Sequence, residues 1–196
     1  MLNEVGASAS AMSTPRQRRS GAWIPLCSTA CYSRGVKLAL AALLLLTAPA
    51  LAGDIVGRAV VVDGDTIDIH GARIRLDGID APESRQQCQD EAGEDYPCGR
   101  ISALALDDFL AASRPTRCVQ VDTDRYGRIV ATCWRADGAE VNAWLVRNGF
   151  AIDFKRYSRG KYLPEQAEAQ KAKRGVWRGL FVNPDEFRRT KRHPPS

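Results

Sequence analysis

Three consecutive segments near the middle of the chain have the apolar and polar pattern of β-strands. The first, residues 55–63, is apolar and rich in β-branched residues, and the segments 66–70 and 73–77 alternate apolar and polar positions. Residues 117–134 hold two more β-rich runs on either side of the turn Asp124-Arg125-Tyr126-Gly127. The pattern predicts a three-stranded meander followed by a β-hairpin.

Apolar residues with helical spacing lie between and after these strands. Residues 101–112 predict one helix, and a short second helix begins near Val141 and ends at Gly149. A last helix is predicted from Pro164 to Arg174, and a polar loop covers 82–99. Five strands in a three-plus-two order, with a helix between, favour an α+β fold that is mainly β. We expect a five-stranded Greek-key barrel of the OB type with about three flanking helices.

The first 52 residues contain an export signal by pattern. Residues 36–52 place Lys37 before a short apolar run and end in Ala50-Leu51-Ala52, which predicts a signal peptide with cleavage near Ala52. The apolar run is too short to cross a bilayer, which needs about 20 residues. We therefore expect an exported protein, periplasmic or secreted, with no membrane attachment after cleavage. Residues 1–35 are interpreted as a disordered extension or as sequence upstream of the true start.

Setting this segment aside removes most of the net positive charge. The whole chain has a net charge of +5, but residues 1–52 contain five of its 28 basic residues and one of its 23 acidic residues. The remainder has 23 basic and 22 acidic residues, so its net charge of +1 does not point to a nucleic-acid partner. Residues 184–196 are interpreted as a solvated basic C-terminal tail.

Four cysteines follow the predicted cleavage point, an even number that in an exported protein indicates two disulfides: Cys88, Cys98, Cys118 and Cys133. A hairpin centred between Arg125 and Tyr126 places Cys118 opposite Cys133, within the Cα separation that a disulfide needs. Cys88 and Cys98 then pair across the polar loop. Zinc binding is disfavoured, because this part of the chain has two histidines and no C-x-x-C motif.

A set of charged residues between positions 62 and 83 carries the candidate chemistry. Asp63 and Asp65 end the first strand, Arg75 lies in the third, and Asp80 and Glu83 follow it. Antiparallel neighbours can bring Asp65 and Asp80 together, and two close carboxylates repel each other unless a cation lies between them. Oxygen ligands without imidazole or thiolate favour Ca²⁺ or Mg²⁺.

Several short motifs occur in a characteristic order: Asp63-Gly64-Asp65-Thr66, Arg75, Asp80-Ala81-Pro82-Glu83, Asp124-Arg125-Tyr126-Gly127-Arg128, Val146-Arg147-Asn148-Gly149 and Gly175-Val176-Trp177. Each motif alone is common. In this order and at these spacings, over residues 55–177, they resemble the staphylococcal nuclease family. The resemblance implies an OB-fold endonuclease that uses one Ca²⁺ ion and leaves 3′-phosphate ends on DNA and RNA.

The resemblance also implies a metal site. By position, Asp65 and Asp80 match the calcium carboxylates of the family. Ala81 matches a residue that contributes its backbone carbonyl, so an alanine in place of the family's threonine changes little. Asp63 matches an acid that lies near the metal without binding it directly.

Three further positions match residues that act on the phosphodiester. Glu83 matches the general base or water-orienting residue of the family, and Arg75 and Arg128 match the two arginines that grip the scissile phosphate. Two guanidinium groups suit the charge that develops on phosphate oxygens, with a bidentate geometry that lysine lacks.

Substrate contacts are expected in two places. Residues 155–162 interleave cations with aromatics, a mixture that follows a nucleic-acid backbone and stacks on bases. Here Tyr157 matches a family tyrosine, whereas Lys155 stands where the family has another. Arg125 and Tyr126 match positions near the phosphate end of the nucleotide. Because no motif suggests reading of base edges, we expect little sequence preference. A monomer without a stable protein partner is the default expectation.

Each residue also has a purely structural interpretation. Arg75 could face solvent beside Asp77 or Asp68, and Arg128 could pair with Asp122 or Asp124. The alternative function is a non-catalytic OB-fold module that binds single-stranded nucleic acid or another polyanion. Such a module needs the arginines but has no use for clustered acids, which repel phosphate when no metal is present. The joint presence of acids and arginines favours the enzyme.

Overall fold

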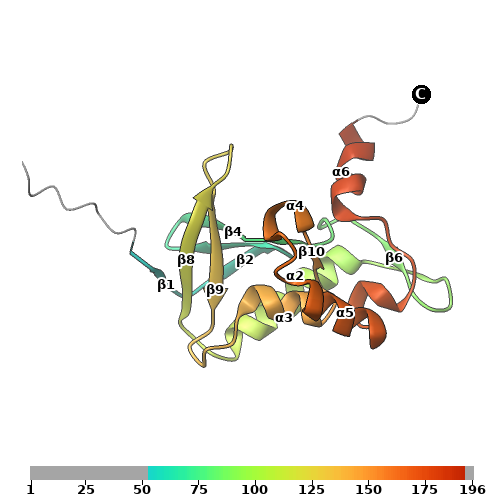
Figure 1. Ribbon diagram of the computed structural model, residues 1–196, viewed down its shortest axis with the longest axis horizontal. Helices are drawn as coiled ribbons and strands as arrows, with labels where there is room; N and C mark the ends of the chain where they lie inside the picture. Colours follow the sequence, from blue (N-terminus) through green and yellow to red (C-terminus); the bar gives the residue numbers. More distant parts are fainter. Residues whose placement is uncertain (1–52, 193–196) are drawn as a thin grey trace, which may run out of the picture. The chain divides into compact units, whose positions relative to one another are not determined.

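The computed structural model describes residues 53–192. The predicted signal peptide, the preceding extension and the last four residues of the chain lie outside the described residues. The described part is an α+β unit in which a mainly β core is covered by helices (Figure 1).

Six strands form the main sheet, and four short strands form two separate pairs. The main-sheet strands are β1 (Ile55–Gly57), β2 (Val60–Asp63), β3 (Thr66–Ile69), β4 (Ala72–Leu76), β8 (Thr116–Thr123) and β9 (Ile129–Trp134). The short strands are β5 (Ile79–Asp80), β6 (Cys88–Gln89), β7 (Asp95–Tyr96) and β10 (Ile152–Asp153). The predicted meander is β2-β3-β4, and the predicted hairpin is β8-β9.

The hairpin joins the meander through a parallel pairing of β4 with β9, and the order of the sheet is β1-β8-β9-β4-β3-β2. The predicted closed five-stranded barrel is not confirmed, because the first expected strand is interrupted at Arg58 and Ala59. Its two halves pair with different partners, β1 with β8 and β2 with β3, and so form opposite edges of the sheet. Within residues 53–192 no strand pairing closes the sheet between β1 and β2.

Within residues 53–192, five α-helices and one 3₁₀ helix accompany the sheet, more than the three expected. They are α2 (Cys98–Ala111), α3 (Val141–Arg147), α4 (Lys155–Ser158), α5 (Leu163–Lys171), η1 (Gly175–Arg178) and α6 (Pro184–Arg192). In Figure 1, α2, α3 and α5 lie below the sheet, whereas α4, α6 and the tip of the β8-β9 hairpin stand on the other side. The main-sheet strands and these lower helices therefore enclose the core, and the upper side is left for other contacts.

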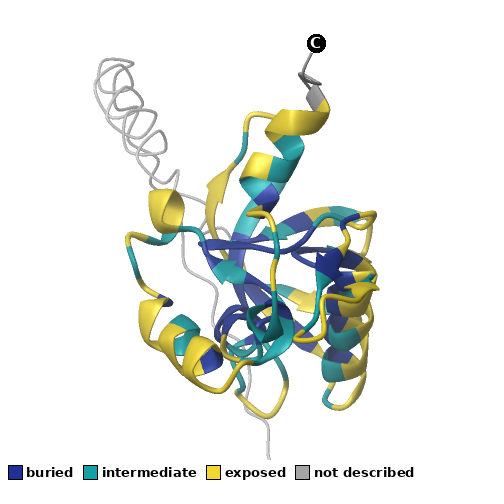
Figure 2. Ribbon diagram, turned by 90° about the vertical axis from the view of Figure 1, so that its right-hand side faces the viewer, coloured by how far each residue is buried: buried dark blue, intermediate teal, exposed yellow. Residues whose placement is uncertain are grey.

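The core is formed by apolar side chains from the sheet and the lower helices (Figure 2). Its fully buried members include Ile67, Ile69, Ile74, Leu76, Leu106, Val141 and Leu145. Each such side chain contributes about 1.5–3 kcal/mol when it is removed from water. This burial fixes β3 and β4, and it thereby fixes the turn and strand that carry Asp65 and Arg75.

Both predicted disulfides are present. Cys118 lies directly opposite Cys133 in the β8-β9 ladder and is bonded to it, as the centre of the hairpin indicated. Cys88 is bonded to Cys98 and so joins the small β6-β7 hairpin to the start of α2. No helix within residues 53–192 has the length and apolar character needed to cross a membrane.

The interpretation of residues 184–196 as a solvated tail is wrong for the part that the structure describes. Residues 184–192 form α6, and Arg188 on this helix contacts two acids of the candidate site. The helix has a favourable start, since proline suits the first turn and Asp185 and Glu186 complement the positive end of the helix dipole.

Candidate functional site

The turn between β2 and β3 brings Asp65 against the segment that follows β5. A side chain at Gly64 would approach the Cβ of Ala81 to 2.7 Å and that of Ser102 to 3.1 Å, so only glycine permits this close contact. An irregularity in the β2-β3 pairing at Val62 bends the strand just before the turn. The backbone N–H of Asp65 is held by the carboxylate of Asp63 at 3.1 Å, and the N–H of Ala81 donates to Asp65 Oδ2 at 3.3 Å.

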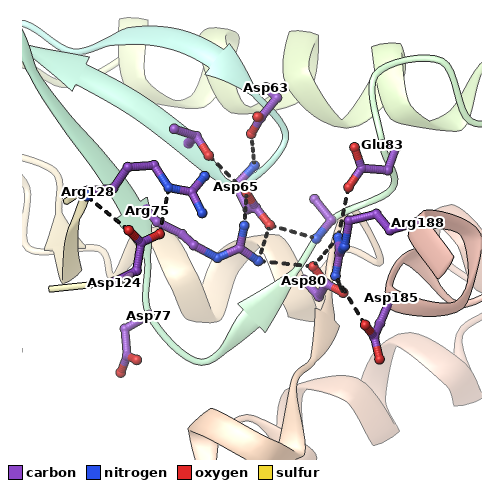
Figure 3. A network of polar contacts seen from close by, with 12 residues as sticks. Asp63, Asp65, Arg75, Asp77, Asp80, Glu83, Asp124, Arg128, Asp185 and Arg188 are labelled. Carbon is purple, nitrogen blue, oxygen red and sulfur yellow. Dashed lines mark hydrogen bonds and ion pairs between the residues drawn. The ribbon is translucent and has the colours of Figure 1, made fainter. Parts of the chain in front are cut away.

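Asp65, Asp80 and Arg75 form the centre of the site (Figure 3). Arg75 extends from β4, and its Nη2 lies 3.0 Å from Asp65 Oδ2 and 3.1 Å from Asp80 Oδ1. One nitrogen therefore joins two carboxylates from different elements. The structural alternative, in which Arg75 pairs with Asp77 or Asp68, is not what the structure has.

Burial makes this arrangement electrostatically demanding. Only 7% of the Asp65 side chain and 1% of the Asp80 side chain are exposed. Burial raises the pKa of Asp65 to about 7; Arg75 lowers it, and the neighbouring Asp63 and Asp80 raise it. Burial alone would lower the pKa of Arg75, but the two aspartates outweigh it and the pKa is raised. Arg75 therefore offsets only part of the effect of burial and of the neighbouring acids on Asp65.

The donor chemistry fits a hard divalent cation. Asp65 and Asp80 offer buried carboxylate oxygens next to the main chain of Ala81. Among residues 53–192 there is no group of three or more His, Cys, Asp or Glu side chains arranged to hold a metal. A cation at this pair would therefore need main-chain and water oxygens as well, which Ca²⁺ accepts readily.

Glu83 lies on the loop after β5, and the first turn of α2 supports it. Its backbone N–H donates to Gln86 Oε1 at 3.1 Å, and its carbonyl accepts from Gln86 N at 2.7 Å. Gly99 packs directly against the carbonyl of Glu83. The Glu83 side chain is 40% exposed, so its carboxylate is accessible to water next to the buried pair.

Arg188 of α6 is a member of this site that the sequence interpretation missed. Its Nη1 and Nη2 lie 3.0 and 2.7 Å from Asp80 Oδ1 and Oδ2, and Nη1 also lies 2.8 Å from Glu83 Oε1 (Figure 3). Burial would lower the pKa of Arg188, but the hydrogen bonds that it donates to both acids outweigh burial and the pKa is raised. The helix-start signal at Pro184-Asp185-Glu186 could have indicated an ordered element, but nothing in the sequence indicates its contact with Asp80.

Arg128 lies at the end of the β8-β9 turn, where Asp124 holds it. Its Nε donates to Asp124 Oδ2 at 2.7 Å, and the other oxygen of Asp124 accepts from the backbone N–H groups of Tyr126 and Arg128. Burial would raise the pKa of Asp124, but the hydrogen bonds with Arg128 outweigh it and the pKa is lowered. Arg75 pairs with Val130 across the sheet, so the position of Arg128 two residues earlier belongs to the same face. The described contacts pair Arg128 with Asp124 rather than with the central carboxylates.

The predicted substrate-contacting residues lie on exposed elements around this centre. Tyr126 is 66% exposed and, with Arg128 and Arg73, lines a shallow groove at the β3-β4 turn. The guanidinium of Arg125 lies 4.9 Å from the ring of Tyr126. Lys155 and Tyr157 lie on α4, which packs beside β5 through a hydrogen bond of 2.9 Å from Phe154 N to the Gly78 carbonyl. The structure thus places both expected contact segments next to elements of the site.

The contact of Gly99 with Glu83 gives a stability prediction. In an ordinary helix a glycine-to-alanine change stabilises, but at Gly99 the new methyl group would overlap the Glu83 carbonyl. We expect Gly99→Ala to lower the free energy of unfolding by about 1–3 kcal/mol, the usual range for overpacking. Urea unfolding measures this value, and Leu104→Ala on the exposed side of α2 is the control. Unchanged or increased stability of Gly99→Ala would contradict the packing described.

Comparison with known proteins agrees with this geometry. Residues 73–179 match the family described as staphylococcal nuclease homologue, a span that includes Arg75, Asp80, Glu83 and Arg128 and begins after Asp65. The chain is 50% identical to the succinoglycan biosynthesis protein ExoI of Rhizobium meliloti (strain 1021), over 74% of this chain and 76% of that protein. It is 39% identical to an uncharacterized endonuclease of Escherichia coli, over 69% of this chain and 85% of the other. It is also 28% identical to a micrococcal nuclease of Shigella flexneri, over 71% and 83% of the two chains. The chain belongs to the staphylococcal nuclease family.

Proposed function

We propose that this nuclease is a calcium-dependent endonuclease that hydrolyses phosphodiester bonds of DNA and RNA with little sequence preference and leaves 3′-phosphate ends. The observation that carries the proposal is the buried pair Asp65 and Asp80, joined by Arg75 and flanked by Glu83. A binding module would gain nothing from burying two carboxylates at the place where it meets a polyanion.

The cation site of this proposal consists of Asp65, Asp80 and the backbone carbonyl of Ala81, with Asp63 orienting the turn. A bound Ca²⁺ ion would polarise a phosphate oxygen and neutralise charge. Asp65 and Asp80 hold that charge in place because their backbones are fixed by the β2-β3 turn and by the pairing of β5 with β10. The raised pKa of Asp65 agrees with a carboxylate that lacks sufficient positive charge around it.

The two arginines are proposed to bind the scissile phosphate. Arg75 is 20% exposed and Arg128 is 27% exposed, so each guanidinium reaches solvent from a fixed position. Asp124 holds Arg128 through Nε and so leaves its terminal nitrogens for a phosphate. Two planar guanidinium groups can stabilise the charge that builds on the equatorial oxygens during displacement.

Glu83 is proposed to accept or orient the proton of the attacking water. Its carboxylate is partly exposed beside Asp80, and Gln86 and Gly99 fix its backbone. A positioned carboxylate of this kind typically accelerates a reaction by about 10²–10⁴-fold.

Nucleic-acid contacts are proposed for Arg125, Tyr126, Lys155 and Tyr157. Exposed aromatic rings next to cations suit base stacking and backbone contact without reading base edges. The two disulfides are typical of proteins that work in an oxidising environment, which supports the proposed export.

The names of the relatives support the proposal in part. The Escherichia coli relative is called an endonuclease and the Shigella flexneri relative a micrococcal nuclease, whereas the Rhizobium meliloti relative is named for succinoglycan biosynthesis. The acids and arginines of this chain support the endonuclease activity, because they suit a charged phosphodiester.

The direct test is cleavage of long single- and double-stranded DNA and of RNA by the purified protein. We expect cleavage of all three with Ca²⁺, none with a chelator, and products that end in 3′-phosphate. Salt-sensitive binding without cleavage in any divalent metal would instead support the non-catalytic binding module.

Replacement of Glu83 tests the assignment of its role. We expect Glu83→Gln to lower kcat by about 10²–10⁴-fold while the Kd for DNA stays within a few-fold, because the change removes the carboxylate that handles the proton but leaves Arg75 and Arg128, the proposed phosphate-binding residues, in place. Steady-state cleavage and fluorescence anisotropy measure the two quantities. Ser84→Ala, an exposed change at the next position, is the control. A Glu83→Gln enzyme of near-normal kcat would remove Glu83 from the mechanism.

A further inference from the structure

Arg188 binds the carboxylate oxygens that a divalent cation at Asp80 would need. Its two terminal nitrogens contact both carboxylate oxygens of Asp80, and one of them also contacts Glu83. Asp80 Oδ1 additionally accepts from Arg75. A guanidinium with this bidentate geometry is a strong partner for a carboxylate. In this arrangement the oxygens of Asp80 are already engaged, and so is one oxygen of Glu83.

The position of α6 is set by the segment that precedes it, residues 180–183, which we call the strap. The backbone of Leu180 exchanges hydrogen bonds of 2.8 and 3.1 Å with Gln89. The Val182 carbonyl accepts from the side chain of Gln86, a fully buried residue, at 2.6 Å. Because Gln86 also contacts the backbone of Glu83, the strap holds α6 next to the loop that carries Glu83. The contact between Arg188 and Asp80 is therefore built into the fold, although 108 residues separate the two in sequence.

The helix itself has little that would hold it there permanently. Pro184 is its only buried residue among 184–191, and Leu180 and Val182 of the strap are 72% and 46% exposed (Figure 2). Its remaining contacts are mostly local, such as those of Arg189 with Asp185 and of Lys191 with the ring of Phe187. Elements with few buried apolar contacts open at low free-energy cost. The ion pairs of Arg188 are thus the main attachment of α6 to the site.

We propose that α6 is a displaceable inhibitory arm, in which Arg188 engages the Asp80 oxygens that the divalent cation requires and must leave before the cation binds. The inference rests on the proposed cation site at Asp65 and Asp80. Arg188 and a divalent cation would repel each other and compete for the same oxygens of Asp80, so each weakens the binding of the other. The arm also forms one wall of a groove, through Phe187, Arg188 and Lys191, and the Glu83 loop forms the other. Withdrawal of α6 removes that wall and frees the Glu83 carboxylate together with Asp80.

The test measures Ca²⁺ affinity by isothermal titration calorimetry in the absence of nucleic acid. We expect Arg188→Gln to bind Ca²⁺ about 5-fold or more tightly than the wild type, the lower end of typical coupling between two ligands. Arg188→Lys keeps the charge but loses the bidentate contact, so its affinity should fall between the two. Arg189→Gln removes a neighbouring cation that is 71% exposed and pairs with Asp185, so its affinity should equal that of the wild type.

Hydrogen exchange of the α6 amides is a second measurement. Its rate would not respond to Ca²⁺ if the role of Arg188 were only structural. In the wild type, saturating Ca²⁺ should increase exchange at the amides of residues 184–192, because the arm is released. Equal Ca²⁺ affinity in all four proteins, or unchanged α6 protection with Ca²⁺, overturns the inhibitory arm alone. Absence of Ca²⁺ binding in every protein overturns both the arm and the proposed cation site.

Discussion

The site depends on the neutralisation of two buried carboxylates. Asp65 and Asp80 are almost completely withdrawn from water, and an isolated ion in such a place is expensive. Arg75 on β4 supplies part of the neutralising positive charge, and Arg188 on α6 supplies the rest. The requirement for positive charge explains why α6, distant in sequence, meets the segment that carries Asp65, Arg75 and Asp80. It also underlies the proposal that a divalent cation binds at the same place.

The scaffold separates a rigid part of the site from a part that can move. The β2-β3 turn, β4 and β5 are fixed by the buried core, so Asp65, Arg75 and Asp80 have little freedom. Glu83 lies on the loop after β5, where Gln86 and Gly99 support its backbone. In contrast, α6 is attached through a backbone strap and one arginine. Positive charge is thus supplied by Arg75, which is fixed, and by Arg188, which can be exchanged.

The parts that the sequence predicted well are those decided by neighbours in the chain. The meander, the hairpin, the Cys118–Cys133 pair and the meeting of Asp65 with Asp80 all follow from antiparallel pairing over short separations. The break between β1 and β2 was missed because nothing in an apolar β-branched run shows that its halves will choose different partners. Arg188 was missed for a related reason. Residues 184–192 contain one large apolar side chain, Phe187, which is too few for apolar spacing to indicate a helix. The contact of Arg188 with Asp80 arises from the strap rather than from any local motif.

The most direct measurement is a crystal structure of the protein grown with Ca²⁺. The account predicts an ion between Asp65 and Asp80 at oxygen distances of about 2.3–2.6 Å, with Arg188 withdrawn from both Asp80 and Glu83. An ordered Arg188 still paired with Asp80 at saturating Ca²⁺, with no ion at the carboxylate pair, would contradict it.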